Sequence, residues 1–252
     1  MCSYSSNNES KSPSSNKEEG LPLYENSMQT GCTHIERGQS PNSDNEPVQK
    51  STVVGRFAPT PSGKLHLGNA FSFLMAYLVA RQAGGSVLMR IEDLDPARSK
   101  QSYADGVFRC LDALGFEWDN EPVYQSSRTE AYFEAYQVLD HKGLLYPCFC
   151  TRSDLHSANA PHFGEEVLYQ GTCRTLSKIE QEEKAKLRNP ATRIVVPTEQ
   201  LAFNDLFQGP QSFNLAESSG DFIVQRSDGV YAYQLAVTVD DAWMGVTSIV
   251  RG

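Results

Sequence analysis

The chain has 252 residues and a formal net charge of −9, from 22 basic and 31 acidic side chains. Broad, non-specific nucleic-acid binding needs a basic face, so this balance argues against it, although a local basic patch that binds one RNA remains compatible. No apolar run reaches the roughly 20 residues that span a membrane, and the N-terminus lacks the apolar core of a signal peptide. We therefore expect a soluble, cytoplasmic protein with no membrane partner.

The first 50 residues differ in composition from the rest of the chain. They are rich in Ser, Asn, Glu, Lys and Pro and contain few large apolar side chains. Such a segment does not bury enough surface to offset the entropy of ordering it, so residues 1–50 are predicted to be a disordered low-complexity tail. Cys2 and Cys32 are expected to be free thiols in a reducing compartment. We assign the tail no function.

The next stretch predicts a strand, a loop, a helix and a second strand. An apolar strand over residues 53–57 leads into a loop with prolines, and the helix that follows is ended by Gly84-Gly85. Residues 87–91 have the composition of a second buried strand. This order is typical of parallel sheets. The core-facing side of the helix is predicted to comprise Phe71, Leu74, and Tyr77 or Leu78.

Charged side chains stand at the carboxyl ends of both strands, where α/β sheets bind ligands. Arg56 lies on the first strand, and Glu92 and Asp93 follow the second. The N-terminus of the helix offers free N–H groups and a partial positive charge to a phosphate. Lys64 and His66 are candidate phosphate donors.

Gly68 allows a ligand to approach the backbone. A His-x-Gly motif alone has low specificity. An ordinary strand-helix-strand unit with a surface histidine therefore remains the alternative to a nucleotide site.

Further along, residues 99–114 and 128–142 are predicted to form amphipathic helices that pack on the sheet, with a loop or short strand over 116–124. From residue 145 to about 221 the expected strands are short and the loops long, with one charged helix over 177–187. We interpret this part as an insertion.

The last stretch is expected to return to the sheet. Residues 222–224 form a strand followed by a turn at 227–229. Residues 233–239 are a buried strand or the start of a helix. Another apolar strand over 246–250 ends at Arg251 and brings a further charge to the same edge of the sheet.

Three cysteines within the insertion suggest a metal site. Cys148 and Cys150 are separated by one residue, a spacing that rarely forms a disulfide but suits one metal ion, and Cys173 follows. Three reduced, partly buried cysteines are the alternative. Zinc normally takes four ligands, and chemistry alone favours a histidine as the fourth. The candidates for that position are His156, His162 and Tyr169.

Several linked motifs resemble one enzyme family. RFAPTPSGKLHLGN followed by MRIEDLD resembles the first signature of the class I glutamyl-tRNA synthetase group, with His66-Leu67-Gly68-Asn69 at its His-Ile-Gly-His-type motif. The resemblance continues through LGFEWDNEPVYQSSR, YPCFCTRSDL, YQGTCR and YQLAVTVDDAWMGVTSIVRG, so that it covers about residues 54–252. It implies a Rossmann-type α/β catalytic fold whose parallel sheet is incomplete at the C-terminus. The implied divisions are 51–144 and 222–252 as parts of the catalytic domain, and 145–221 as a zinc-binding insertion.

The resemblance implies ATP-dependent activation of L-glutamate, with Mg²⁺ accompanying the ATP. Two guanidinium groups suit the two carboxylates of glutamate, and an acidic side chain suits its ammonium, whereas glutamine leaves one arginine facing a neutral amide. Catalytic roles are expected for His66 and Gly68. The glutamate contacts implied are Arg56, Ala58, Thr60, Glu92, Tyr233 and Arg251. The nucleotide contacts implied are Lys64, His66, Gly68 and Asn69.

One branch of this group glutamylates queuosine at the wobble position of tRNA(Asp). Its zinc ligands correspond to Cys148, Cys150, Tyr169 and Cys173, so the resemblance selects tyrosine as the fourth ligand. Val237 replaces an asparagine common in the standard enzymes, which also resembles this branch. We expect tRNA(Asp) carrying queuosine as partner and a monomeric protein. The alternative within the family is a standard glutamyl-tRNA synthetase that charges the 3′ end of its tRNA.

The family has a second, lysine-containing signature beyond the strand that ends at Arg251, and this sequence stops at Gly252. That lysine neutralises charge on the phosphates, worth a few kcal/mol of transition-state stabilisation. The activity is therefore expected of a longer parent protein. An inactive glutamate- or nucleotide-binding fragment is the alternative of another class.

Overall fold

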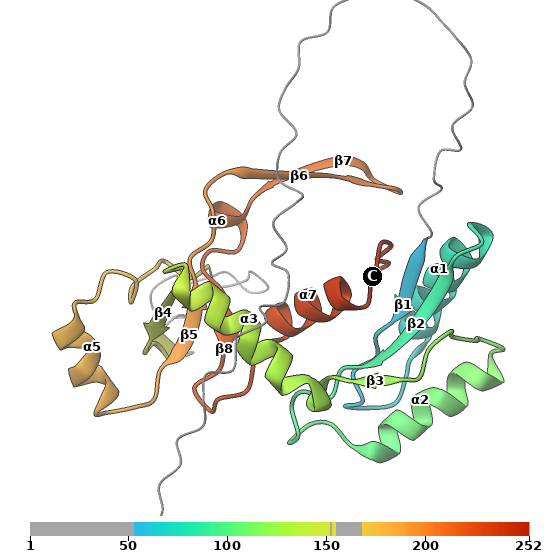
Figure 1. The fold of residues 1–252 in the computed structure, drawn as a ribbon, viewed down its shortest axis with the longest axis horizontal. Coiled ribbons are helices and arrows are strands. Elements are labelled where there is room, and N and C mark those ends of the chain that lie inside the picture. The colour runs from blue at the N-terminus through green and yellow to red at the C-terminus, as the bar shows by residue number, and fades with distance from the viewer. Residues whose placement is uncertain (1–52, 152, 155–167, 252) are drawn as a thin grey trace, which may run out of the picture. The chain divides into compact units, whose positions relative to one another are not determined.

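A computed structural model describes residues 53–151, 153–154 and 168–251 (Figure 1). The predictions for the tail, with Cys2 and Cys32, lie outside the described residues. So do His156 and His162, two of the candidates for the fourth metal ligand. In the described part, no helix is long and apolar enough to cross a membrane.

The predicted strand-helix-strand unit is present and forms a parallel sheet. Strands β1 (Val54–Phe57), β2 (Ser86–Ile91) and β3 (Val123–Tyr124) pair in the order β1-β2-β3, with Val54 opposite Ser86. Helices α1 (Leu67–Gln82) and α2 (Gln101–Ala113) pack on it. Gly55 allows α1 close to β1, because a Cβ there would lie 3.3 Å from the Cβ of Ala80. The core residues of this sheet include Phe57, Val87, Met89 and Ile91.

The predicted buried face of α1 is wrong for Phe71, Leu74 and Leu78, whereas Tyr77 packs against the core. Phe73, Ala76 and Ala80 are the buried residues of the helix, whereas Phe71 is 62% exposed and Leu78 is 48% exposed. Apolar side chains occur all around this helix, so their spacing does not decide which side faces the sheet. The sheet selects the side with the smaller alanines, which permit a close approach.

A second, antiparallel sheet follows in the chain. Its strands β4 (Leu145–Cys148), β5 (Ala191–Ile194) and β8 (Ile223–Gln225) pair in the order β4-β5-β8. The expectation that residues 222–224 rejoin the first sheet is therefore wrong. The 3-10 helix η1 (Gln125–Arg128) leads into α3 (Thr129–His141), and α7 (Tyr233–Trp243) takes the helical alternative for 233–239.

Helix α3 also differs from its prediction, because it packs with α7 and the second sheet, whereas α2 packs on the first sheet as expected. Its aromatic residues Tyr132 and Tyr136 lie against Tyr231, at ring-centroid distances of 6.1 Å and 6.1 Å. The buried residues of this second core are Tyr132, Val224, Tyr231, Leu235 and Ala236.

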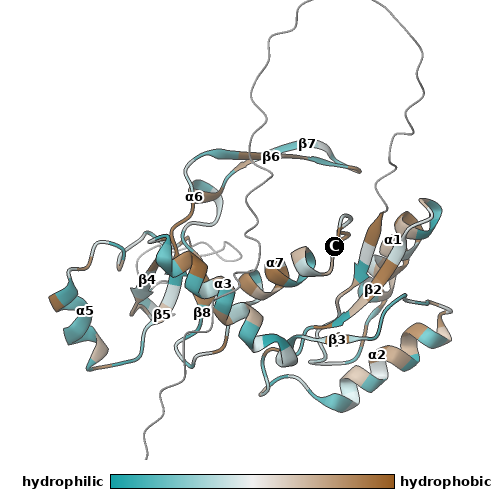
Figure 2. Ribbon diagram, in the orientation of Figure 1, coloured by the Kyte–Doolittle hydropathy of each residue, from teal (hydrophilic) through white to brown (hydrophobic). Residues whose placement is uncertain are grey.

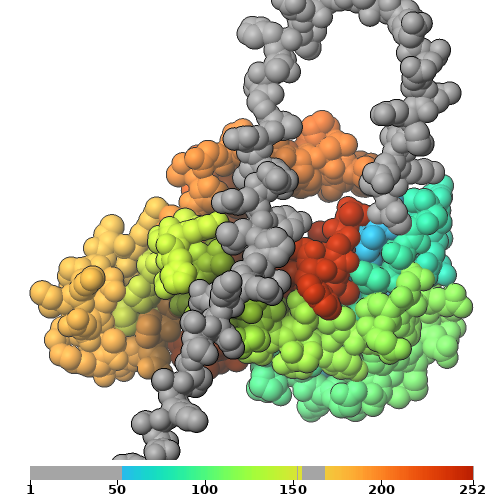
Figure 3. Space-filling model, viewed as in Figure 1, coloured from blue at the N-terminus to red at the C-terminus, as the bar shows by residue number. Residues whose placement is uncertain are grey.

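The remaining elements lie outside these two cores. Helix α5 (Lys178–Ala185) matches the predicted charged helix and is mostly hydrophilic in Figure 2. A hairpin of β6 (Gln200–Asp205) and β7 (Gly209–Asn214), which the sequence analysis did not predict, leads into the short helix α6 (Leu215–Ser218) and projects from the body in Figure 3.

Residues 246–250 do not form the predicted strand. The N–H groups of Thr247 and Ser248 both donate to the carbonyl of Val54, each at 3.0 Å, and Thr247 Oγ1 accepts from the N–H of Val54 at 2.9 Å. These bonds all meet at one residue of β1, so no regular ladder forms. The segment nevertheless runs beside β1 and brings Arg251 to the expected edge.

Candidate active site

A cavity of about 460 Å³ lies at the carboxyl ends of β1 and β2. The loop after β1, the start of α1, the first residue of α7 and residues 250–251 complete its wall. These segments are distant in sequence, so only the folded chain forms the cavity. The residues predicted for glutamate or nucleotide that line it are Arg56, Ala58, Thr60, Lys64, His66, Asn69, Glu92, Tyr233 and Arg251.

Gly68, also predicted to contact the nucleotide, lies in the first turn of α1 and is not one of the residues that line the cavity. A Cβ at this position would lie 3.0 Å from Cε1 of His66, so glycine leaves room for the imidazole. The N–H of His66 donates to Oδ1 of Asn69 at 3.1 Å, which holds the chain at the entry to the helix. The N-terminus of α1 thus opens beside two side chains that can contact a phosphate, His66 and Lys64.

A buried network of charges lies beneath the cavity. Arg56 Nε donates to Asp241 Oδ1 at 2.9 Å, and Arg90 Nη1 donates to the same oxygen at 2.6 Å. Arg90 Nη2 donates to Glu92 Oε1 at 3.0 Å. All four residues are less than 9% exposed. Arg56 and Glu92 are therefore held in place by partners that do not reach the cavity themselves.

The sequence analysis missed Arg90 and Asp241. Each carried a signal, because an arginine inside the apolar strand SVLMRI and an acidic pair inside an apolar helix are costly to bury without partners. The two residues are partners of each other, however, and they lie 151 residues apart in the chain.

Asp240 forms the centre of a second set of buried contacts. Its carboxylate accepts from Gln125 Nε2 at 2.8 Å, Arg128 Nε at 2.6 Å and the hydroxyl of Tyr132 at 2.8 Å. The guanidinium of Arg128 also stacks on Trp243 at 3.7 Å. Burial and the bond to Asp240 raise the pKa of Tyr132. These contacts attach α7, and hence Tyr233 at its first turn, to η1 and α3.

The electrostatics of the cavity centre on Glu92. Burial raises the pKa of its carboxyl, while the positive charges of Arg90, Arg56 and Arg251 oppose that rise. Arg251 lies over the ring of Tyr233 at 5.3 Å. The cavity therefore contains two guanidinium groups and one carboxylate around a small volume, which suits a ligand with negative groups and one positive group.

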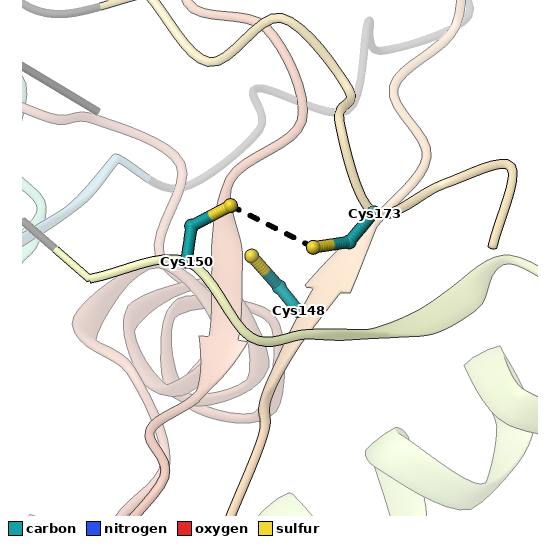
Figure 4. A group of neighbouring side chains, drawn as sticks. All are labelled: Cys148, Cys150 and Cys173. Atoms are coloured by element: carbon teal, nitrogen blue, oxygen red, sulfur yellow. Dashed lines mark hydrogen bonds between the residues drawn. The ribbon is translucent and has the colours of Figure 1, made fainter. Parts of the chain in front are cut away.

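The three cysteines of the insertion come together as predicted (Figure 4). The sulfur atoms of Cys148, Cys150 and Cys173 lie within 4.8 Å of one another, with 3.6 Å between those of Cys150 and Cys173. The hydroxyl of Tyr169 is 3.6 Å from the sulfur of Cys148 and accepts from the N–H of Cys173 at 2.8 Å. Three thiols therefore lie close together, with the hydroxyl of Tyr169 beside them.

The spacing fits a tetrahedral ion. Zn–S bonds of about 2.3 Å place two sulfur ligands about 3.8 Å apart, and an oxygen ligand lies about 3.5 Å from a sulfur. Arg193 Nε donates to the sulfur of Cys148 at 3.2 Å, and its guanidinium stacks on the ring of Tyr169 at 3.8 Å. Burial raises the pKa of the Cys148 thiol, whereas its hydrogen bonds with Tyr169 and Arg193 lower that pKa. The net shift of the pKa is downward.

A parallel strand-helix-strand unit with a helix N-terminus and charged groups at the strand ends is typical of α/β domains that bind nucleotides. The comparison with protein families identifies the group. The chain belongs to the family described as tRNA synthetases class I (E and Q), catalytic domain, which matches residues 52–252.

Individual relatives agree. The chain is 48% identical over 211 residues to a protein of Nitratidesulfovibrio vulgaris named glutamyl-Q tRNA(Asp) synthetase, covering 79% of this chain and 65% of that protein. It is 48% identical over 212 residues to a protein of the same name from Symbiobacterium thermophilum, with the same two coverages, 79% and 65%. The chain thus spans about 65% of the length of these curated relatives.

A solved structure shares the fold. A glutamate tRNA ligase from Elizabethkingia meningosepticum, in complex with its amino acid, matches with a TM-score of 0.66 and 26% identity. The match covers 79% of this chain and 43% of that chain. The resemblance stated from the motifs is confirmed by the family match and by these relatives.

Proposed function

We propose that the protein takes part in the ATP-dependent activation of L-glutamate and its transfer to queuosine at the wobble position of tRNA(Asp). The observation that carries this proposal is the cavity in which Arg56, Glu92 and Arg251 meet beside the N-terminus of α1. The names of the relatives that are 48% identical support the choice of acceptor.

Each charged group has a role in holding glutamate. Asp241 occupies Nε of Arg56, so the terminal nitrogens of that guanidinium are the ones left for a carboxylate. Arg251 takes the second carboxylate, and Glu92 takes the ammonium. Glutamine in the same position leaves one guanidinium opposite a neutral amide, which disfavours it.

Activation needs no nucleophile from the protein. An oxygen of the substrate carboxylate attacks the α-phosphorus of ATP, the bond to the β-phosphate oxygen breaks, and pyrophosphate leaves as the acyl-adenylate forms. The chain supplies orientation and stabilises charge, with His66, Lys64 and the N-terminus of α1 beside the phosphates. Mg²⁺ accompanies the ATP, held mainly by phosphates and waters.

In the transfer step a hydroxyl oxygen of the acceptor attacks the acyl carbon. AMP leaves with the bonding electron pair, and the hydroxyl proton passes to the departing phosphate or to water. A standard glutamyl-tRNA synthetase directs the same step to the 3′ end of its tRNA. The 26% identity to a glutamate tRNA ligase against 48% to the glutamyl-Q relatives favours the modifying reaction.

Zinc is proposed as a structural ion held by Cys148, Cys150, Tyr169 and Cys173. The donor types and their spacing support it. The ion would join the start of the insertion to the loop that carries Tyr169. The division into a catalytic segment 51–144 and an insertion from 145 is proposed with it, and β8, which pairs with β5, belongs to the sheet of the insertion although the predicted boundary was 221.

Two assays test the proposal on the full chain. Radiolabelled glutamate and ATP are supplied with tRNA(Asp) that carries queuosine, with tRNA(Asp) that lacks it, and with tRNA(Glu). We expect label only on the first. Label on tRNA(Glu) would support the standard synthetase. Glutamate-dependent pyrophosphate exchange is measured in parallel, because its absence would support an inactive binding fragment.

A further inference from the structure

Arg193 is a buried cation that lies beside the three cysteines of the insertion. It stands on β5, the middle strand of the second sheet, opposite Tyr146 of β4, and it is only 6% exposed. Among the described residues it forms no ion pair with a carboxylate. A buried charge without an opposite charge nearby is costly, so the groups around this guanidinium indicate which anion balances it.

The contacts of the Arg193 guanidinium lead to the cysteine cluster and to the neighbouring strand. Its Nε donates to the sulfur of Cys148 at 3.2 Å, and its carbon lies 3.8 Å from the centre of the Tyr169 ring. Its Nη1 donates to the backbone carbonyl of Asp221 at 2.6 Å, whereas the carboxylate of Asp221 accepts from the hydroxyl of Tyr146 at 2.7 Å. Cys148 and Tyr169 are therefore the contacting groups that can carry a negative charge.

A zinc ion at the cluster would make these groups the missing anion. Zinc binds cysteine as the thiolate, and three thiolates outweigh the two positive charges of the ion, so the loaded site is negatively charged. A guanidinium forms a charge-assisted hydrogen bond with such a group. Partners that bond to metal ligands from outside the coordination sphere orient those ligands and raise the affinity for the metal.

We propose that Arg193 is a positioning residue of the zinc site, whose guanidinium balances the negative charge of the loaded site and holds Cys148 and Tyr169 in place as ligands. This inference rests on the zinc site of the proposed function. The same side chain joins the site to the second sheet, because β5 carries it and its bond to Asp221 reaches the chain just before β8. Zinc binding therefore stabilises this sheet as well as the loop that contains Tyr169.

The test measures the affinity of the full chain for zinc. Bound zinc is counted in protein purified without chelator and then removed, and Zn²⁺ is titrated back in competition with a chelating dye. Arg193→Met removes the charge and the donor at similar length and should weaken zinc binding about 10- to 100-fold. Arg193→Lys keeps the charge but loses Nε and the flat stacking surface, and should weaken zinc binding about three- to tenfold.

Arg174→Met is the matched control, because it removes an arginine from the same part of the insertion. The side chain of Arg174 is 50% exposed and lies 3.7 Å from the carboxylate of Asp221. Solvent screens an exposed charge, so the affinity for zinc should change less than about threefold. Equal affinities in Arg193→Met and in this control would overturn the proposal.

Cobalt distinguishes a positioning role from a merely structural one. Co²⁺ takes the place of zinc at tetrahedral thiolate sites and gives a sulfur-to-metal charge-transfer absorption. Because the hydrogen bond from Arg193 lowers the energy of the sulfur electrons, its loss should move this absorption to longer wavelength in both Arg193 variants and not in Arg174→Met. Weaker zinc binding with an unmoved absorption would overturn the proposal. If Arg193→Met does not fold, Arg193→Lys decides by the same two measurements.

The same samples separate this inference from the proposals on which it depends. Bound zinc in the unsubstituted chain, with no effect of the Arg193 variants, would leave the zinc site standing and overturn only the role of Arg193. An unsubstituted chain that binds neither Zn²⁺ nor Co²⁺ would overturn both. Calorimetric titration with L-glutamate decides the glutamate function independently of either result.

Discussion

At the scale of single residues, the candidate site depends on charges that are buried and shared. Asp241 accepts from both Arg56 and Arg90, and Arg90 also donates to Glu92. Removing one member of such a set leaves another charge buried without a partner, which typically costs about 3–5 kcal/mol. The network therefore holds two glutamate contacts rigidly, and the residues that hold them do not touch the ligand.

Glu92 should give glutamate binding a distinct pH dependence. Only the ionised carboxylate attracts the substrate ammonium, and burial raises the pKa of Glu92 above its usual value of 4.5. As the pH is lowered, the affinity for glutamate should therefore begin to fall at a higher pH than it would if Glu92 had the ordinary pKa of a glutamate side chain. Calorimetry between about pH 8 and pH 5 measures this loss.

The contribution of Glu92 to folding stability changes with pH in the opposite direction to that of an acidic group whose pKa is lowered by folding. The folded chain binds the proton of Glu92 more readily than the unfolded chain, so the contribution of this group to the free energy of unfolding is full below the unfolded pKa and is lost as the pH rises through the folded pKa. The variant Glu92→Gln is the control for the binding measurement. It should lower the affinity for L-glutamate about 10- to 100-fold and remove the pH dependence of that affinity. Equal affinity of the unsubstituted chain at both ends of the range would contradict the role of Glu92.

At the scale of elements, the insertion shows how much sequence spacing can predict. The spacing of Cys148 and Cys150 indicated a metal site, and the structure brings Cys173 to them. The residues alone left the fourth ligand open among two histidines and a tyrosine. Tyr169 reaches the cluster because its strand-like segment bridges to Gly220, a long-range contact that local spacing does not reveal.

Loss of zinc should destabilise the insertion. Cys150→Ser should lower bound zinc from about one ion per chain to near zero and lower the midpoint of thermal unfolding by about 4 °C or more, because a ligand loss of ~2 kcal/mol shifts a chain of this size by that amount. Metal analysis without chelator and calorimetry measure the two effects. Cys110→Ser, a half-buried thiol on α2, is the matched control. Purified protein without zinc would reject the site.

At the scale of the whole molecule, the glutamate cavity exists only in the folded chain. Arg56 and Arg251 are separated by nearly the whole described sequence, and the Arg56–Asp241 bond alone spans 185 residues. A ligand of this cavity therefore binds the native state and not the unfolded chain. Such binding stabilises the native state by mass action.

L-glutamate should raise the unfolding midpoint, and its uncharged relative should not. At 100 times the dissociation constant, glutamate contributes about 2.7 kcal/mol, equivalent to a shift of about 5–10 °C. L-glutamine at the same concentration should cause little shift, and D-glutamate controls for charge and ionic strength. Differential scanning calorimetry makes the measurement. An equal shift with glutamine would contradict the two-guanidinium scheme, and Arg251→Gln should abolish the shift with glutamate.

The sequence by itself determined the elements and motifs whose causes are local. Glycines end α1, α2 and α3, short apolar runs mark β1 and β2, and the motif around His66 identifies the family. These features depend on backbone preferences and on neighbours a few residues away, which a sequence displays directly.

Only the tertiary structure decided which residues meet. It selected the buried side of α1, placed β8 in the second sheet, and left residues 246–250 without a ladder. It also paired Arg90 with Asp241. Packing and charge pairing depend on distances between remote segments, and local spacing contains no information about those distances.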